Sequence, residues 1–145
     1  MRVDVRQKRH TEMKILHISN PVYGWIDITF GEEPDTYTVT ASDVPNDCLR
    51  DLAAAMVRLK EGSTRETVEF SIEPGFVRCE LFREIDSLRM VFRNREHAAS
   101  SFETDFPFTA FSKRLRFELL RIASSYGTDE GWTQPFPHRE VSSLS

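Results

Sequence analysis

The sequence predicts an α+β domain: a single antiparallel β-sheet of about five to six strands, with two helices packed on one face of the sheet. Three observations support this fold class. Apolar residues alternate with a period of two in several short segments, recur at helical spacing in two longer segments, and short turns separate the strand-like segments. Short connections favour antiparallel pairing, because parallel strands need long crossovers. The expected order of elements is β-β-β-α-β-β-β-α.

Length and composition indicate a single domain over residues 1–145. The chain has 145 residues, of which 39% are hydrophobic and 29% are charged. This is enough for one hydrophobic core and too apolar for a disordered chain. Residues 1–12 are interpreted as a polar lead-in, because they lack the apolar stretch of a secretory signal. No apolar run approaches the roughly 20 residues that span a bilayer, so no membrane association is expected.

Residues 128–145 are expected to pack on the core as a C-terminal strap. They include Trp132, Phe136 and Leu144, and burial of each of these side chains stabilises the fold by about 1.5–3 kcal/mol. Two prolines in the segment stiffen the chain and so reduce the entropic cost of ordering it. The alternative is an exposed aromatic patch that binds a partner.

Three strand segments are expected before the first helix, at residues 13–17, 23–30 and 36–41. The second of these alternates most clearly, with one face directed to the core and the other directed outward. The outward face carries Tyr23, Trp25 and Asp27. Residues 31–35 contain strong strand breakers and are expected to form the turn to the third strand.

The first helix is expected over residues 47–62. Its apolar residues recur at three- and four-residue spacings, and Gly62 stands where a helix commonly ends. A run of three alanines would let the helix approach the sheet closely. The candidate N-cap residues are Ser42, Asp43 and Asn46.

Three further strands are expected after this helix, at residues 67–72, 76–82 and 88–92. A Pro-Gly turn joins the first two of them, and residues 94–105 are interpreted as a polar connection. The second helix is expected to begin near Asp105 or Pro107 and to run to about Tyr126, because apolar residues advance by three or four positions along one face. That face consists of Phe108, Phe111, Leu115, Leu119, Ile122 and Tyr126.

The charges are distributed unevenly along the chain. Between Asp27 and Glu73 there are 11 acidic and four basic residues, a net charge of −7, whereas residues 76–121 have nine basic and seven acidic residues, a net charge of +2. An acidic surface repels nucleic acid and favours a basic partner, provided that its charges share a face. The residues expected to contact such a partner are Tyr23, Trp25, Asp27, Glu32, Glu33, Asp35, Asp43, Asp47 and Asp51. The simpler interpretation is a solvated surface, with Asp43 and Asp47 near a helix N-terminus, where the helix dipole favours negative charge.

No segment carries a catalytic or metal-binding signature. The four histidines are isolated, no paired-cysteine motif is present, and the six glycines are not clustered into a phosphate-binding loop. No serine lies on a nucleophile elbow. Cys48 and Cys79 are expected to be buried thiols, which favours a cytoplasmic location. We therefore expect no enzyme activity, no cofactor and no metal, and the acidic balance argues against nucleic-acid binding.

Several features occur together along residues 23–144: an opening hairpin, an Ala/Leu-rich helix that ends in Gly, a strand meander and a long C-terminal helix. The most specific positions are Glu73-Pro74-Gly75, Tyr126-Gly127, Trp132 and Phe136-Pro137. This combination resembles small uncharacterised bacterial proteins, some of which are encoded beside polymorphic toxins and look like immunity proteins. The resemblance implies a non-catalytic cytoplasmic protein that binds and occludes a cognate toxin, with a basic toxin domain as its partner.

Two alternatives remain open from the sequence. One is a small-molecule-binding or enzymatic α+β domain with a pocket between the sheet and the helices. The other is a homo-oligomer that associates through an edge strand. A deep polar pocket would favour the first alternative, and a filled core would oppose it.

Overall fold

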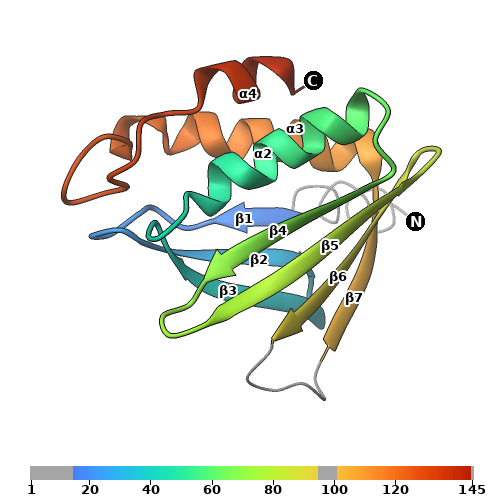
Figure 1. Cartoon of the computed structure of the whole chain (residues 1–145), viewed down its shortest axis with the longest axis horizontal. Coiled ribbons are helices and arrows are strands. Elements are labelled where there is room, and N and C mark those ends of the chain that lie inside the picture. Colours follow the sequence, from blue (N-terminus) through green and yellow to red (C-terminus); the bar gives the residue numbers. More distant parts are fainter. Residues whose placement is uncertain (1–14, 95–100, 145) are drawn as a thin grey trace, which may run out of the picture.

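The computed structural model describes residues 15–94 and 101–144, which form one seven-stranded sheet and three α-helices (Figure 1). The strands are β1 (Leu16–Ile18), β2 (Trp25–Glu32), β3 (Asp35–Ser42), β4 (Arg65–Ser71), β5 (Phe76–Glu84), β6 (Ser87–Asn94) and β7 (Ser101–Pro107). The helices are α2 (Cys48–Lys60), α3 (Phe108–Arg121) and α4 (His138–Ser143), and a 3₁₀ helix, η2 (Ala123–Ser125), follows α3. Each strand pairs antiparallel with the next one in the sequence. The predicted α+β class with a single antiparallel sheet is confirmed.

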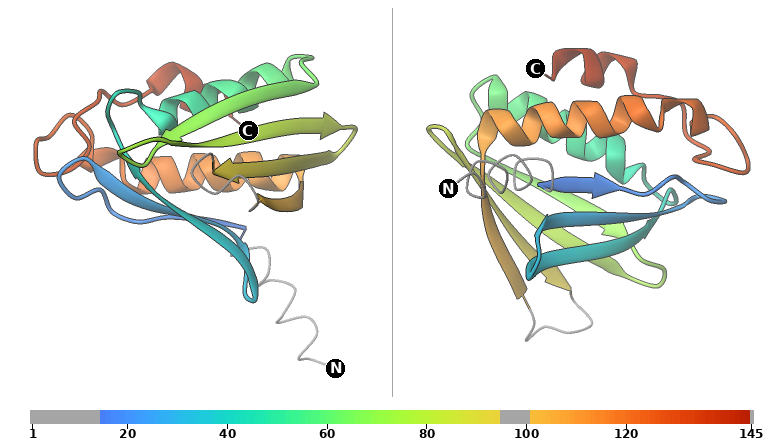
Figure 2. Two further views of the ribbon diagram at one scale, coloured as in Figure 1. Left: turned by 60° about the horizontal axis from the view of Figure 1, so that its bottom comes forward. Right: turned by 180° about the vertical axis from the view of Figure 1, so that it is seen from behind.

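The sheet is strongly curved, so that strands far apart in the strand order meet across its concave face. The ring centroids of Phe30 on β2 and Phe92 on β6 are 4.7 Å apart, whereas four strand spacings in a flat sheet would separate them by about 19 Å. Tyr37 on β3 stacks on Phe102 on β7 with a centroid distance of 5.2 Å. Figure 2 shows the curvature from two further sides. The concave face is therefore filled by aromatic side chains.

The strands β3 and β4 have the least extensive pairing in the sheet, because they pair at a single position, Ser42 with Ser71. The helix α2 connects these two strands in the sequence and packs on β4 where the strands diverge (Figure 1). A helix that covers an open strand edge protects it from pairing with other chains.

The sequence of the helix α2 provides an N-cap residue, an apolar face and a glycine after the last turn. The carboxylate of Asp47 accepts a hydrogen bond from the backbone N–H of Arg50, which satisfies one of the free donors in the first turn. Gly62 follows the helix with a φ of 127°, a conformation that costs little for glycine. The buried residues of the helix are Cys48, Leu49, Leu52, Ala53, Ala55, Met56 and Leu59.

The helix α3 packs along the edge strand β1 and buries its apolar stripe against the sheet. The stripe continues beyond α3 through η2. All six residues predicted for it are buried, namely Phe108, Phe111, Leu115, Leu119, Ile122 and Tyr126. Arg114 Nε donates to the carbonyl oxygen of Leu16 at 2.9 Å, and the backbone N–H of Ile18 donates to Glu118 Oε1 at 2.8 Å. Side chains of α3 therefore bond to backbone groups of β1 as a further strand would.

The segment after Gly127 packs over the helices and adds a third layer to the molecule. Trp132 is 0% exposed, its indole Nε1 donates to Asp47 Oδ1 at 3.1 Å, and its ring meets the edge of Tyr126. The helix α4 contacts α2 and α3 on the side away from the sheet (Figure 1). The aromatic residues of this segment thus belong to the core or pack beside it.

The structure corrects four details of the predicted fold. The sheet has seven strands rather than five to six, because Ser101–Pro107 form β7; residues 101–105 were expected in a polar connection and the last two at the start of the second helix. The short helix α4 is a third α-helix beside the two expected. The second helix begins at Phe108 and ends at Arg121 rather than at Tyr126. The N-cap of α2 is Asp47; the candidates Ser42, Asp43 and Asn46 lie upstream of it.

Candidate functional site

The structure separates the nine predicted partner-binding residues into three groups. The first lies at the start of β2, the second at the turn between β2 and β3, and the third around the start of α2. The groups are Tyr23, Trp25 and Asp27; Glu32, Glu33 and Asp35; and Asp43, Asp47 and Asp51. The first two groups lie at opposite ends of β2, about 20–25 Å apart at ~3.3 Å per residue.

Asp43 holds the C-terminal segment to the connection between β3 and α2. It is 4% exposed, and its Oδ2 accepts hydrogen bonds from the backbone N–H and the hydroxyl of Thr133 at 2.8 and 2.7 Å. Its carbonyl oxygen accepts a further bond from Gln134 Nε2 at 3.0 Å. Because these groups are bonded within the chain, Asp43 has a structural role.

Asp47 and Asp51 also have partners within the chain. Asp47 caps α2 and accepts a hydrogen bond from Trp132 Nε1. Burial raises the pKa of the Asp47 carboxyl, and the hydrogen bonds from Arg50 N–H and Trp132 oppose that rise. Asp51 Oδ2 accepts from Asn46 Nδ2 at 2.9 Å. The third group of predicted residues therefore builds the N-terminal end of α2.

The first group forms part of an exposed apolar surface, which we call the aromatic patch and which consists of Val22, Tyr23, Trp25 and Val44. Tyr23 is 68% exposed and Trp25 is 38% exposed. Tyr23 and Gly24 form the tight turn between bridged residues Val22 and Trp25, and both have positive φ angles, of 47° and 82°. This pattern is typical of a type I′ hairpin turn. The turn directs the tyrosine side chain into solvent.

Backbone hydrogen bonds fix this turn on two sides. The N–H groups of Tyr23 and Gly24 donate to the carbonyl oxygens of Glu130 and Gly131 at 2.8 and 2.7 Å, and the N–H of Asp43 donates to Gly24 O at 2.9 Å. Figures 1 and 2 show the loop between β1 and β2 beside the loop between η2 and α4. A Cβ atom at Gly24 would lie 2.9 Å from Asp43 Oδ1, so a larger residue does not fit there. The aromatic patch is therefore presented on a constrained backbone.

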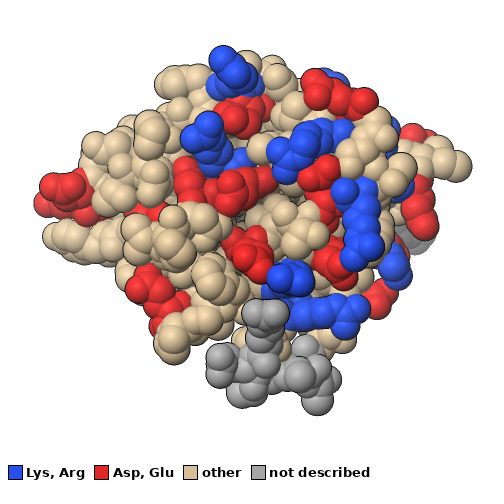
Figure 3. All heavy atoms as spheres, viewed as in Figure 1, with Lys and Arg blue, Asp and Glu red and all other residues tan. Residues whose placement is uncertain are grey.

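Acidic side chains surround the aromatic patch. Asp27 is exposed on the same strand face as Trp25, and Asp129 and Glu130 are exposed in the loop bonded to the turn. On the face drawn in Figure 3, the end of the molecule formed by these loops shows Asp and Glu side chains and no Lys or Arg among the described residues. On that face the charges beside the patch therefore favour a cationic partner, while Arg121, bonded to Asn20 Oδ1 at 3.1 Å, places one cation against the loop between β1 and β2.

The second group lies on the rim of a groove between the β2–β3 turn, β7 and α3. This groove has a volume of about 990 Å³. Glu32, Glu33 and Asp35 line it together with Asp105 of β7, and the exposed ring of Phe117 lines it from α3. The structure thus brings these three predicted carboxylates together with a fourth one. We call this feature the acidic groove.

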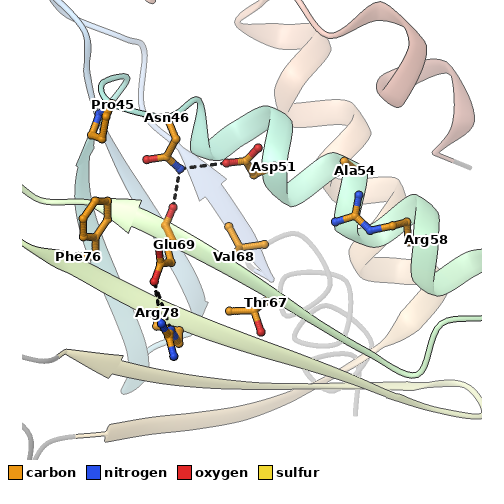
Figure 4. A pocket seen from close by; sticks show the side chains of 10 residues that line it. All are labelled: Pro45, Asn46, Asp51, Ala54, Arg58, Thr67, Val68, Glu69, Phe76 and Arg78. Atoms are coloured by element: carbon orange, nitrogen blue, oxygen red, sulfur yellow. Dashed lines mark hydrogen bonds and ion pairs between the residues drawn. The ribbon is translucent and has the colours of Figure 1, made fainter.

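A smaller hollow of about 670 Å³ lies between α2, β4 and β5 (Figure 4). Asn46 Nδ2 donates to Asp51 Oδ2 and to the carbonyl oxygen of Glu69, both at 2.9 Å. The Glu69 carboxylate pairs with Arg78 at 3.0 Å, and Arg58 pairs with a glutamate of β4 at 2.8 Å. These polar side chains bond to one another and join the helix to the sheet, so the hollow is a weaker candidate for binding a partner.

The interior between the sheet and the helices is filled by side chains. The ring of Phe30 lies within 6.4 Å of the rings of Phe70, Phe92 and Phe111, and all four side chains are fully buried. This arrangement opposes a ligand pocket between the two layers. In residues 15–94 and 101–144, no three His, Cys, Asp or Glu side chains are grouped to hold a metal ion. In the same part of the chain, no helix has the length and hydropathy of a membrane span.

Sequence reasoning missed four residues of these surfaces. Val22 and Val44 of the aromatic patch lie just outside the strands whose alternation marked Tyr23. Asp105 was expected at a helix start and lies on β7. Phe117 gave a usable signal, because it is an aromatic residue away from the buried stripe of its helix.

Known proteins give no relative from which a function could be transferred. No family model matches the chain, and no curated protein and no solved structure matches it either.

Proposed function

We propose that this protein is a non-catalytic binding protein of the immunity type, which docks on a basic bacterial toxin domain and occludes it. The observation that carries the proposal is the aromatic patch, in which Tyr23 and Trp25 are exposed on a backbone that is hydrogen-bonded to a second loop. A cluster of exposed apolar side chains is a common mark of a protein-binding surface.

Tyrosine and tryptophan suit this role because they offer a large contact area for few rotatable bonds. Both residue types are enriched among the few interface positions that supply most of the binding energy. Since the turn is fixed by the backbone of Glu130 and Gly131, little conformational entropy is lost there on binding. These features support protein binding rather than catalysis.

The carboxylates around the patch support a basic partner. Asp27, Asp129 and Glu130 are exposed near the aromatic side chains, and charges at the rim of an interface mainly raise the association rate and set specificity. A standard interface buries about 800 Å² on each partner, so one partner domain could cover the patch and extend along the β2–β3 hairpin. We propose that this association takes place in the cytoplasm.

The proposal is tested by replacing the aromatic side chains. The variant Tyr23→Ala/Trp25→Ala is expected to bind the purified toxin domain about 30-fold more weakly, because hot-spot truncations cost ~2 kcal/mol or more. Titration calorimetry at two salt concentrations measures this change. Ile85→Ala is the matched control, because Ile85 is 85% exposed at the distant β5–β6 turn. Equal affinity of the wild type and the double variant would contradict the proposal.

A further inference from the structure

The acidic groove is a second surface with its own composition, at the opposite end of β2 from the aromatic patch. Its floor is largely apolar. Phe117, which is 54% exposed, lies on the α3 side, and Phe106 and Pro107 lie at the end of β7. Ile15 and Ala110 complete the apolar lining. With a volume of about 990 Å³, the groove has the size of a site for a short peptide segment or a small ligand.

The rim of the groove has an excess of negative charge. Four carboxylates and two cations line it, and they are Glu32, Glu33, Asp35 and Asp105 against Lys113 and Arg114. Arg114 is engaged within the chain, because its Nε donates to Leu16 O at 2.9 Å and its Nη2 lies 3.0 Å from Glu118 Oε2. Its guanidinium also lies 4.9 Å from the ring centroid of Phe117. The groove therefore combines an apolar floor with a rim that attracts cations.

We infer that the acidic groove binds a segment of the partner protein in which apolar side chains are flanked by Lys or Arg. The apolar side chains would pack on Phe106 and Phe117, and the flanking cations would pair with Glu33, Asp35 and Asp105. This complementarity of charge and apolar surface favours a basic peptide segment over an acidic one or a nucleic acid, both of which the carboxylates repel. The inference rests on the proposed function for the source of the segment, and it assigns to that partner a second contact outside the aromatic patch.

The test uses a peptide probe, so that it does not depend on the partner. A fluorescein-labelled hexapeptide, Lys-Lys-Leu-Phe-Lys-Lys, blocked at both ends, is titrated with the full chain by fluorescence anisotropy. The peptide Glu-Glu-Leu-Phe-Glu-Glu serves as the charge control. The basic peptide is expected to bind, more weakly as salt is raised, and the acidic peptide is expected not to bind. Equal binding of both peptides, or binding of neither, would overturn the inference.

Variants locate the binding site. Glu33→Gln/Asp35→Asn is expected to weaken binding of the basic peptide about five-fold, since each exposed ion pair contributes ~0.2–1 kcal/mol. Separately, Phe117→Ser is expected to weaken binding by a similar factor, since it removes apolar contact area from the groove. Asp129→Asn/Glu130→Gln removes the same charge from the aromatic end and is expected to leave peptide binding unchanged. An equal loss in this control would indicate non-specific attraction and would overturn the inference.

Two further variants distinguish binding in the groove from binding at the aromatic patch, and a partner segment from another occupant of the groove. Tyr23→Ala/Trp25→Ala is expected to retain peptide binding, so failure of the groove and failure of the proposed function give different results. Peptide binding that arises only after Arg6, Lys8 and Arg9 are replaced by Ser would assign the groove to this chain's own N-terminal segment. That result would overturn a partner segment as its occupant.

Discussion

Asp47 shows how one side chain of this protein combines local and distant roles. It caps α2 through Arg50 N–H and also accepts a hydrogen bond from the indole of Trp132, 85 positions away. Its Oδ2 has no hydrogen-bond partner among the described residues. Burial of this oxygen disfavours the ionised carboxyl and raises its pKa.

The raised pKa of Asp47 predicts a defined pH dependence of stability. The folded-state pKa of Asp47 lies above the ordinary value of 3.8. The contribution of Asp47 to the free energy of unfolding is therefore fully present below pH 3.8 and is lost as the pH rises through the folded-state pKa. Asp47→Asn does not titrate at this position, so the free energy of unfolding of the variant should increase relative to that of the wild type as the pH is raised from about 4 towards neutrality. Urea unfolding across this range measures the difference. A constant difference, or one that changes in the opposite direction, would contradict this assignment.

The second prediction at the residue scale concerns the chemical reactivity of the thiols of Cys48 and Cys79. Both thiols are 0% exposed, and burial raises the pKa of each well above its ordinary value, so little reactive thiolate forms. In the native state we expect neither to react with a thiol reagent such as DTNB, and both to react in denaturant. The control is Ser124→Cys, which places a thiol at an exposed position. Rapid reaction of the native wild type would show that one of the buried sites opens.

At the residue scale, periodicity predicted which side chains face outward but not what they bond to. The alternation over residues 23–30 correctly placed Trp25 and Asp27 on the exposed face of β2, whereas Tyr23 is exposed in the turn before that strand. It could not reveal that Asp43 bonds to Thr133, because these residues are 90 positions apart and only tertiary folding brings them together. A run of carboxylates therefore predicted a surface that in part lies inside the protein.

At the element scale, the edge strand β1 is completed by charged side chains of α3. Glu118 is fully buried, accepts from Ile18 N–H, and pairs with Arg121 Nη2 at 2.9 Å and Arg114 Nη2 at 3.0 Å. The two arginines in turn donate to carbonyl oxygens of β1. This network gives the short strand β1 its second set of backbone partners and covers an edge that would otherwise be open.

Glu118→Ala should destabilise the fold by about 1–3 kcal/mol, because it leaves the backbone N–H of Ile18 without its acceptor and two partly exposed arginines without their carboxylate. Glu103→Ala is the matched control. Glu103 pairs with Arg89 on the surface at 3.3 Å, and exposed pairs contribute roughly 0–1 kcal/mol. Chemical unfolding of both variants measures the two costs. If Glu118→Ala cost no more than Glu103→Ala, the network would not support β1 energetically.

The C-terminal segment should also contribute strongly to stability. Trp132→Ala removes a side chain that is 0% exposed and is expected to cost about 3–5 kcal/mol. Trp25→Ala removes the same side chain from the 38% exposed position on β2 and should cost less than Trp132→Ala, because part of that side chain already lies in water. Thermal and urea unfolding compare the two. Similar costs for both variants would mean that the segment after Gly127 adds little to the core.

Most elements were predictable because their apolar residues have a clear period. The helix α2 was expected over residues 47–62 and is found at Cys48–Lys60. The strand β7 was missed because charged and hydroxyl residues dominate its sequence, and Phe106 is its one buried residue. Its weak alternation is visible at Phe102 and Phe106, which are separated from each other by three polar residues.

At the scale of the whole molecule, the curvature of the sheet decides which charges share a surface. The acidic residues between β2 and α2 are close in the sequence, but the β2–β3 hairpin carries them to opposite ends of the molecule. The full order of strands was left open by the sequence, and only the antiparallel pairing of strands joined by short turns was predictable. The curvature was not, because it depends on contacts such as that between Phe30 and Phe92. For this reason the sequence suggested one acidic surface where the fold forms an aromatic patch and a separate groove.

Contact between the aromatic patch and a basic partner is tested most directly by site-specific photo-crosslinking in the native cells. Benzoylphenylalanine is introduced in place of Tyr23 in one variant and of Ile85 in another, since both positions are exposed and lie in different turns. We expect the probe at position 23 to form one dominant crosslink, to a basic protein, and the probe at position 85 to form none with that protein. Crosslinks of equal strength from both positions, or from position 85 alone, would contradict a docking surface at the aromatic patch.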